Sequence, residues 1–359
     1  MSKIDQYAAL QARIRALYAK MISNEKWDQL YTCRNNDEVV QILRDTVYQP
    51  YLENINENNL FPRRIEFEIK KHLTSIYETI CRQASSEVRH LFKQLFSIYE
   101  VDNIKAILRA VRIGMTWERL RYLLFPYPES QFYRLQDLCE ASSIEAVIDN
   151  LESSPYSSAL SHALPRYTSE KTLFALEVAL DLDYWRKLWK SINGLSGNDE
   201  RYSKKIIGSS LDHQNLLWAL RYRYFHSLSE EEIINYTLPF GNKIHDHDIQ
   251  QIAAGGDVVQ VLSRIYPYIP NLSELMHEPK LGLASLELVL QRDLKEKCEN
   301  TFVGEPFHLG LPLAYLTLVE MEIQDLTVLL EANELGITRE NYQQYLLYRR
   351  EADYNKMVA

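Results

Sequence analysis

A repeating pattern of apolar and polar positions begins at Ser97–Gly114, which reads SIYEVDNIKAILRAVRIG. Apolar residues recur there at steps of three and four, which predicts the second half of a long helix. These residues are Ile98, Val101, Ile104, Ile107, Leu108 and Val111. A polar series runs beside this apolar stripe and consists of Glu100, Asp102, Asn103 and Arg109.

The same arrangement returns twice further along the chain. Asp212, Asn215 and Arg221 lie in LDHQNLLWALRYRYF, and Glu322 and Gln324 lie in VEMEIQDLTVLLEANELG. Aligning Asn103 with Asn215 and Gln324 also aligns the apolar residues that follow each of them. In this alignment Leu330 takes the place of the arginine, so the last copy departs from the other two. The sequence therefore predicts a helical unit that is repeated three times.

Each repeat is expected to contain a pair of long helices. The opening helices carry Glu68, Glu177 and Glu287 at matching places, and turn-forming residues separate each opening helix from its partner. The predicted long helix pairs span about 63–113, 168–225 and 280–336. Groups of short helices are predicted between them, at about 1–60, 114–165 and 226–275. The expected caps of these short helices are Ser23, Thr116, Ser229 and Thr338.

The short-helix groups share a finer apolar pattern. The first two groups share five apolar positions without a gap: Leu30, Val39, Leu43, Tyr48 and Leu52 in the first, and Leu138, Val147, Leu151, Tyr156 and Leu160 in the second. The third group has the same spacing at Ile249, Val258 and Leu262 and, after a one-residue insertion, at Tyr268 and Leu272. The N-terminal group has no long pair before it, and the last long pair has only the stub 337–359 after it. Equal numbers of long pairs and short groups suit a closed three-fold ring, in which the N-terminal group completes the last lobe. We therefore expect residues 1–359 to form a single all-α domain of three similar lobes.

Composition excludes several classes of protein. Only 11 Gly and 12 Pro interrupt 359 residues, which agrees with a helical class. The net charge of −9 argues against nucleic-acid binding, because such binding needs a basic face. The four scattered cysteines contain no CxxC pair and are interpreted as reduced thiols of a cytosolic protein. No signal peptide or membrane-spanning run is predicted, so the protein is expected to be soluble.

The most metal-like run is His245-Asp246-His247-Asp248, since imidazole and carboxylate groups bind zinc or iron. Residues two apart on a helix point to different sides, so a polar lead-in to a short helix is the favoured interpretation. The glycines and lysines of Gly194–Lys205 lack phosphate-loop spacing and indicate an inter-helix loop. No motif of nucleophilic or metal-dependent catalysis occurs, so no catalytic residue, metal or cofactor is predicted.

Two interpretations of the repeated polar sets remain open. The sets form a binding surface, or they form interhelical hydrogen bonds that fix how the long pairs meet. The structural interpretation is favoured. From the residues alone, the chain is an acidic helical protein with three-fold internal repetition, which suits a scaffold or socket better than a catalyst.

The chain also resembles a known family, the C subunit of bacterial and archaeal V/A-type rotary ATPases, which is called the d subunit in the eukaryotic vacuolar enzyme. Four segments carry the resemblance in the family's order: YAALQARIRALYAKMI, YEVDNIKAILRAVRIG, LDHQNLLWALR and LGLPLAYLTLVEMEIQDLTVLLEANELGI. The resemblance implies a funnel-shaped, pseudo-three-fold helical body that is not an enzyme itself. It implies binding to the central-stalk subunits D and F and to the membrane rotor ring of proteolipid c/K subunits. It further implies no direct nucleotide binding, a monomer outside the complex, and a location on the cytoplasmic side of a membrane.

In this hypothesis the protein transmits torque between the D–F shaft and the ring during ATP-coupled proton or sodium transport. The candidate partner or interlobe contacts are Glu100, Asp102, Asn103, Arg109, Asp212, Asn215, Arg221, Glu322 and Gln324. The main alternative is a helical-repeat adaptor unrelated to a rotary motor. A third hypothesis, a helical metalloenzyme using His245 and His247, requires stoichiometric bound metal.

Overall fold

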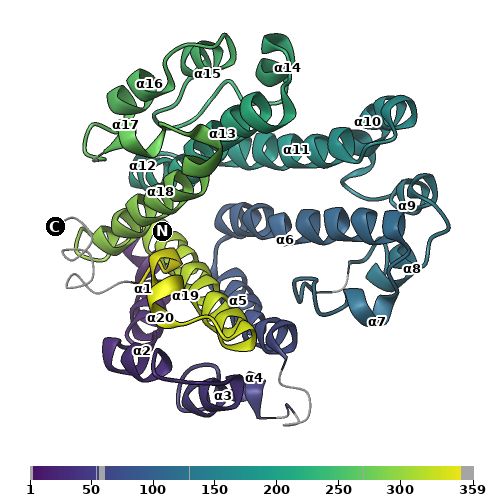
Figure 1. The fold of residues 1–359 in the computed structure, drawn as a ribbon. Helices are drawn as coiled ribbons and strands as arrows, with labels where there is room; N and C mark the ends of the chain where they lie inside the picture. The colour runs from purple at the N-terminus through teal and green to yellow at the C-terminus, as the bar shows by residue number, and fades with distance from the viewer. Residues whose placement is uncertain (1–2, 54, 56–60, 129, 270, 349–359) are drawn as a thin grey trace. The chain divides into compact units, whose positions relative to one another are not determined.

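The computed structural model describes residues 3–53, 55, 61–128, 130–269 and 271–348 of the chain, and every regular element in these residues is a helix (Figure 1). The predicted all-α class is therefore confirmed. Parts of the predicted 1–60 group and of the 337–359 stub lie outside the described residues. The internal contacts divide the chain into two compact units, Met1–Tyr184 with Leu318–Ala359 (unit 1) and Trp185–Thr317 (unit 2). The two units are described separately below.

Unit 1 contains the first long helix pair. Helices α5 (Pro62–Gln83) and α6 (Ser86–Ile113) are joined by a two-residue turn and pack against each other (Figure 1). The centre of the predicted apolar stripe of α6 is buried, with Ile104, Ile107 and Leu108 fully inaccessible, while Ile98 and Val111 at its ends are partly exposed. Gly114 ends α6 with a φ of 66°, a left-handed conformation that glycine adopts without a steric penalty.

Short helices surround this pair in unit 1. They are α1 (Lys3–Tyr18), α2 (Asn24–Leu30), α3 (Asn36–Leu43), α4 (Gln49–Leu52), α7 (Trp117–Leu120), α8 (Leu135–Cys139), α9 (Ile144–Asn150), α10 (Ser157–Glu170), α20 (Arg339–Tyr342) and the 3₁₀ turn η4 (Gln343–Tyr345). Ser23, Thr116 and Thr338 occupy the N-cap positions of α2, α7 and α20, as predicted. The start of α11 (Phe174–Asn193) and the end of α19 (Gly310–Leu335) also belong to unit 1.

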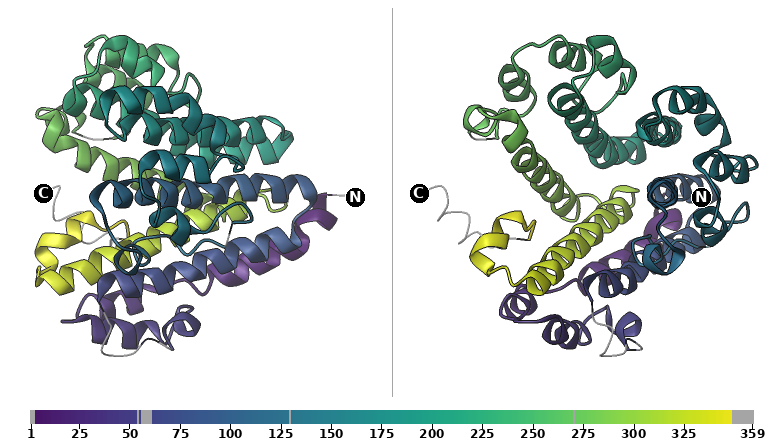
Figure 2. Two further views of the ribbon diagram at one scale, coloured as in Figure 1. Left: turned by 90° about the vertical axis from the view of Figure 1, so that its right-hand side faces the viewer. Right: turned by 45° about the vertical axis from the view of Figure 1, so that its right-hand side comes forward.

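Unit 2 is built from one interrupted long helix, a series of short helices and a second long helix. The elements are α12 (Gly197–Ser203), the π-helical turn η2 (Lys204–Gly208), α13 (Ser209–Arg221), the π-helical turn η3 (Tyr222–His226), α14 (Glu230–Asn235), α15 (Asp246–Ala253), α16 (Val258–Ile265), α17 (Leu272–Leu275) and α18 (Pro279–Thr301). Helix α13 packs against α18, and the short helices α14 to α17 follow one another between them along the chain (Figure 2). Ser229 forms the predicted capping box with Glu232 at the start of α14.

The η3 turn changes the spacing at the end of its long helix. In α6 the left-handed residue Gly114 lies 11 positions after Asn103, whereas the left-handed residue Ser227 lies 12 positions after Asn215. A π turn inserts one residue into a helix, which accounts for the difference.

The apolar pattern of the short-helix groups is buried almost throughout. The ten matched residues of the first two groups are at most 5% exposed, as are Ile249, Leu262 and Leu272, while Val258 is 6% exposed. The prediction for Tyr268 is wrong, because its side chain is 52% exposed. Tyr266 is the buried tyrosine of the third group, at 1% exposure, so the chain is one residue shorter before this tyrosine and two residues longer between it and Leu272.

No helix in the described part of the chain has both the length and the apolar character needed to cross a bilayer.

Candidate functional site

An acidic side chain lies at the same register position in each of the three repeats. In unit 1, Glu322 of α19 accepts hydrogen bonds from the hydroxyl of Tyr48, at 2.8 Å, and from the backbone N–H of Ile22, at 2.9 Å. Glu100 of α6 accepts from the hydroxyls of Tyr156, at 2.7 Å, and Tyr133. Tyr48 and Tyr156 are the tyrosines that the sequence pattern matched, so two of the acids anchor equivalent short helices to a long helix.

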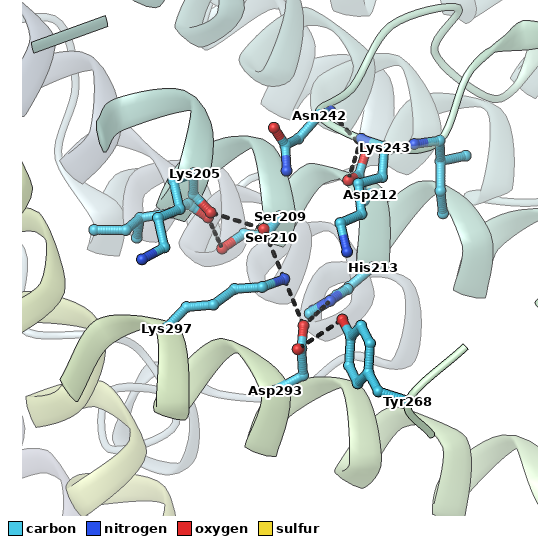
Figure 3. Close-up of polar contacts among 12 residues, drawn as sticks. Lys205, Ser209, Ser210, Asp212, His213, Asn242, Lys243, Tyr268, Asp293 and Lys297 are labelled. Carbon is cyan, nitrogen blue, oxygen red and sulfur yellow. Dashed lines mark hydrogen bonds and ion pairs between the residues drawn. The ribbon is translucent and has the colours of Figure 1, made fainter. Parts of the chain in front are cut away.

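In unit 2 the equivalent acid, Asp212 of α13, has different partners. Its carboxylate accepts the backbone N–H groups of Asn242, Lys243 and Ile244 at 2.8, 2.7 and 3.2 Å (Figure 3). This loop passes so close to α13 that a Cβ atom on Gly241 would lie 2.2 Å from Asp212 Oδ1. The absence of a side chain at Gly241 therefore lets the loop close over the carboxylate.

A second polar residue, three positions after each acid, holds a backbone segment 22 or 23 positions further along the chain. The Asn103 amide accepts from the N–H of Phe125 at 2.7 Å and donates to its carbonyl at 2.9 Å. Asn215 makes the same pair of bonds with Leu238, at 2.9 and 2.8 Å. Both asparagines are at most 2% exposed, so each unmade bond would cost about 1–3 kcal/mol.

The third copy uses Asp325 for this contact, one position after the residue that the sequence alignment selected. Asp325 is fully buried and accepts from the N–H groups of Leu347 and Tyr348 at 2.8 and 2.7 Å, whereas Gln324 is exposed. The alignment of Gln324 with Asn103 is therefore off by one residue. Both residues are polar, so residue type alone does not show which of them faces the loop.

The corrected register also changes the arginine position of the third copy. Arg109 forms a two-point ion pair with Glu177 of α11, at 2.7 and 2.8 Å, and Arg221 donates to Glu287 of α18 at 2.6 Å. Glu331, rather than Leu330, occupies the equivalent position of α19. It pairs with Arg63 of α5 at 3.2 Å. The third copy thus has an ion pair of reversed charge, made with Arg63, which lies five positions before Glu68, the residue matched with Glu177 and Glu287. The placing of Leu330 at the arginine position is wrong by one residue.

Asp102 belongs to a further ionic contact within unit 1. Lys105 lies between Asp102, at 2.9 Å, and Asp181 of α11, at 2.6 Å. Burial lowers the pKa of Lys105, but the two carboxylates outweigh burial and raise it overall, so the lysine stays charged. Lys105 and Arg109 thus join α6 to α11 in unit 1, while the candidate residue Asp102 pairs with Lys105 on α6 itself.

Unit 2 contains an additional polar cluster between α13 and α18 (Figure 3). Asp293 accepts from Lys297 at 2.5 Å and from the Tyr268 hydroxyl at 2.8 Å, and His213 Nε2 lies 3.7 Å away. Burial opposes ionisation of Asp293, but the neighbouring His213 and Lys297 hold its pKa below the ordinary value. Lys297 also donates to Ser209 Oγ at 3.1 Å, whereas the buried His213 Nε2 has no hydrogen-bond partner within the described residues.

Burial raises the pKa of the anchoring acids. The pKa of Glu322 rises to about 7 and that of Asp212 to about 6, although the hydrogen bonds they accept favour the charged form. Their carboxyl groups contact donors of their own chain, which is the arrangement of a structural anchor rather than of an acid–base catalyst.

The metal-like run forms the start of a short helix, which is the favoured interpretation. His245 is the N-cap residue of α15, and the Asp248 carboxylate accepts from its backbone N–H at 2.9 Å. Asp248 also pairs with Arg264. Within the described residues no group of three or more potential metal ligands is found. The four cysteines are free thiols.

Comparison with known proteins gives the family. The family model described as "ATP synthase (C/AC39) subunit" matches residues 10–345. The chain belongs to this family. It is 25% identical to the A-type ATP synthase C subunit of Methanocaldococcus jannaschii over 95% of this chain and 86% of the relative. It is 26% identical to the corresponding C subunit of Methanothermobacter thermautotrophicus, over 90% and 83% of the two chains. The C subunit of Pyrococcus abyssi is 22% identical over 95% and 90%.

For this C/AC39 chain, the sequence pattern identifies most of the repeated polar residues but misses several of their partners. It matches Glu177 with Glu287 without indicating that they pair with Arg109 and Arg221. It also misses Asp325 and the ion pair of Glu331 with Arg63. A better signal is present, since Glu322 and Asp325 have the same three-residue spacing as Asp212 and Asn215.

Proposed function

We propose that this chain is the non-catalytic central-stalk subunit of a V/A-type rotary ATPase. In this role it links the D–F shaft to the membrane rotor ring and transmits torque for ATP-coupled proton or sodium transport. The observation that carries the proposal is the match of one subunit family across residues 10–345. The relatives, which are named as the C subunit of A-type ATP synthases, support the same assignment.

The contacts of the long helices support a mechanical role. Buried acids and asparagines hold short helices and loops against α6, α13 and α19 through hydrogen bonds. Ion pairs join these three helices to α11, α18 and α5, respectively. A part that transmits torque has to resist deformation, and a close-packed helical body with satisfied polar anchors does so. No step of this role requires a catalytic group.

The three-lobed organisation is part of the proposal. The repeated contacts favour lobes built around the pairs 63–113, 168–225 and 280–336, with the N-terminal group completing the last one. Support comes from unit 1, where Tyr48 and Ile22 bind Glu322 of α19, about 300 positions away in the sequence. We propose that the lobes are related by three-fold pseudo-symmetry, as in a funnel-shaped body.

Exposed apolar ends of the long helices support contact with partner proteins. Ile113 at the end of α6 is 70% exposed, Leu335 at the end of α19 is 68% exposed, and Phe225 in η3 is 53% exposed. Large apolar side chains at element ends are common interface contacts. The net charge of −9 supports a basic shaft as the partner. The proposed location is the cytoplasmic face of a membrane, through the ring, with a monomer outside the complex.

Affinity purification of the tagged chain from detergent-solubilised membranes tests this function. The expected result is co-purification of subunits D and F and the proteolipid, together with no ATP hydrolysis by the isolated chain. A preparation from the soluble fraction is the control for nonspecific capture. Recovery of an unrelated partner without any rotary ATPase subunit would favour the helical-repeat adaptor instead, and ATP hydrolysis by the pure chain would contradict the proposal.

A further inference from the structure

One cavity of unit 1 has a composition that the proposed function does not explain. It has a volume of about 300 Å³ and lies among α1, the α3–α4 connection and α5. Its charged lining residues are Arg13 and Lys20, both of them exposed, and no carboxylate among the described residues lines it. An acidic chain with a net charge of −9 thus has a purely cationic cavity at this place.

His72 is the second observation at this cavity. Its side chain lines the cavity, is only 7% exposed, and makes no hydrogen bond within the described residues. Its ring contacts are edge contacts with Tyr48 and Tyr51. Burial lowers the pKa of His72 to about 4, so the ring is neutral at pH 7 and offers one N–H donor. His72 therefore places a neutral N–H donor at the wall of the cavity.

The equivalent position in the second repeat belongs to an internal ion pair. By the alignment of Glu68 with Glu177, His72 corresponds to Asp181. Asp181 is a carboxylate that satisfies the cation Lys105 at 2.6 Å. In the register set by Asp325, Lys105 corresponds to Thr327, so neither member of this ion pair is present at the His72 position.

Hydroxyl groups complete the lining. Ser75 and Thr79 follow His72 on α5 at steps of three and four, so the three residues lie on one side of that helix. The Thr79 hydroxyl already donates to the Ser75 carbonyl at 2.9 Å, so the available hydroxyl donors are those of Ser75 and of Tyr51 on α4. A neighbouring hollow of about 410 Å³ shares Lys20, and its only carboxylate, Asp45, is paired with Lys26 at 3.4 Å. Cations, hydroxyl donors and a neutral imidazole are the groups that bind tetrahedral or planar oxyanions.

We propose that this cavity is an oxyanion-binding site, with Arg13 and Lys20 supplying charge and His72 donating a hydrogen bond to a phosphate or carboxylate group. The site is independent of the proposed rotor function, since it rests on the cavity lining alone. Its ligand is either inorganic phosphate or a carboxylate such as an acidic side chain.

The test uses the full chain and two probes, inorganic phosphate and glutarate, added at constant ionic strength set with chloride. Histidine ring resonances are followed by NMR, with His72 assigned through H72Q and the exposed His162 as an internal reference. The expected result is a saturable shift of the His72 resonances with a dissociation constant of about 1–10 mM, while His162 does not move. A shift with phosphate alone identifies free phosphate as the ligand, and a stronger shift with glutarate identifies a carboxylate.

Two charge-reversal variants make the result specific. The double variant R13E/K20E should weaken binding at least about tenfold, whereas the matched control R112E/R119E, two arginines of unit 1 outside the cavity, should bind as the original chain does. Calorimetry of the same variants repeats the measurement without relying on His72, and thermal melting shows whether each variant is folded. Non-saturable shifts with both probes, or equal loss in both double variants, would overturn the proposal.

Discussion

Glu322 in unit 1 and Asp212 in unit 2 occupy the same position of their repeats but accept hydrogen bonds from different kinds of donor. Glu322, with its longer side chain, reaches Tyr48 and Ile22, which are 274 and 300 positions away in the sequence. Asp212 has a shorter side chain and holds three N–H groups of a loop only 30–32 positions away. The comparison shows that the repeat retains a buried acceptor at this position, while the length of the acid and its donors vary with the segment to be anchored.

The largest effect is expected from D212L, which leaves three backbone N–H groups without their acceptor. We expect a loss of about 3–5 kcal/mol in the free energy of unfolding, since each buried unsatisfied group costs about 1–3 kcal/mol and removal of a buried charge offsets part of this. D212N keeps an acceptor oxygen and should lose less. Hydrogen exchange at residues 242–244 should accelerate strongly in D212L and moderately in D212N. Unchanged exchange in both variants would mean that the carboxylate does not hold this loop.

Glu322 should make stability depend on pH. Its folded-state pKa of about 7 lies above the ordinary value of 4.5, so between these pH values the folded chain binds a proton that the unfolded chain releases. Stability from this group is therefore complete below about pH 4.5, falls as the pH rises to about 7, and stays constant above that. The total change is on the order of 3 kcal/mol.

The variant E322Q should lack this pH dependence while retaining an acceptor for one of the two donors. Denaturant unfolding at pH 5 and pH 8 measures this pH dependence of stability. D212N is the matched comparison and should remove a smaller part of the pH dependence, because the pKa of Asp212 is raised only to about 6. If the wild-type chain and E322Q lose equal stability between pH 5 and pH 8, Glu322 does not titrate in this range.

A smaller effect is expected from removing one tyrosine hydroxyl. Y48F leaves Glu322 with the Ile22 N–H as a donor, and Y156F leaves Glu100 with the Tyr133 hydroxyl. Each variant should lose about 1–2 kcal/mol, with the larger loss for Y48F because Glu322 is only 1% exposed whereas Glu100 is partly accessible. Equilibrium unfolding of both variants gives the ranking. A larger loss in Y156F would contradict the expectation that the more buried acid, Glu322, depends more strongly on its tyrosine.

The smallest effect is expected at the reversed ion pair. R63E or E331R alone places like charges together and should cost at most about 1 kcal/mol, because both side chains are partly exposed. The double variant R63E/E331R restores an ion pair in the orientation used by Arg109 and Glu177 and should recover most of the loss. A double-mutant cycle in low salt measures the coupling. No recovery in the double variant would show that these side chains do not interact.

The long helices could be predicted from the sequence because their apolar stripe is local. Ile104, Ile107 and Leu108 lie at helical spacing and are buried as expected. The caps Ser23 and Ser229 were predictable for the same reason, since a cap acts within its own turn.

The partners of the polar residues could not be predicted, because they depend on segments far apart in the sequence. Whether Gln324 or Asp325 faces the loop near Leu347 is decided by where that loop passes. The extra residue of η3 and the burial of Tyr266 in place of Tyr268 arise from changes of spacing by one or two residues that an ungapped pattern does not represent. The cavity at His72 depends on three elements meeting, so no local pattern indicates it.

The most direct test of the proposed function is a calorimetric titration of the purified chain with the D–F shaft complex of the same organism. The account predicts saturable binding that weakens as salt is added, because an acidic body is proposed to bind a basic shaft. If the folded chain does not bind the D–F complex at concentrations at which the native ATPase assembles, the proposed function is contradicted.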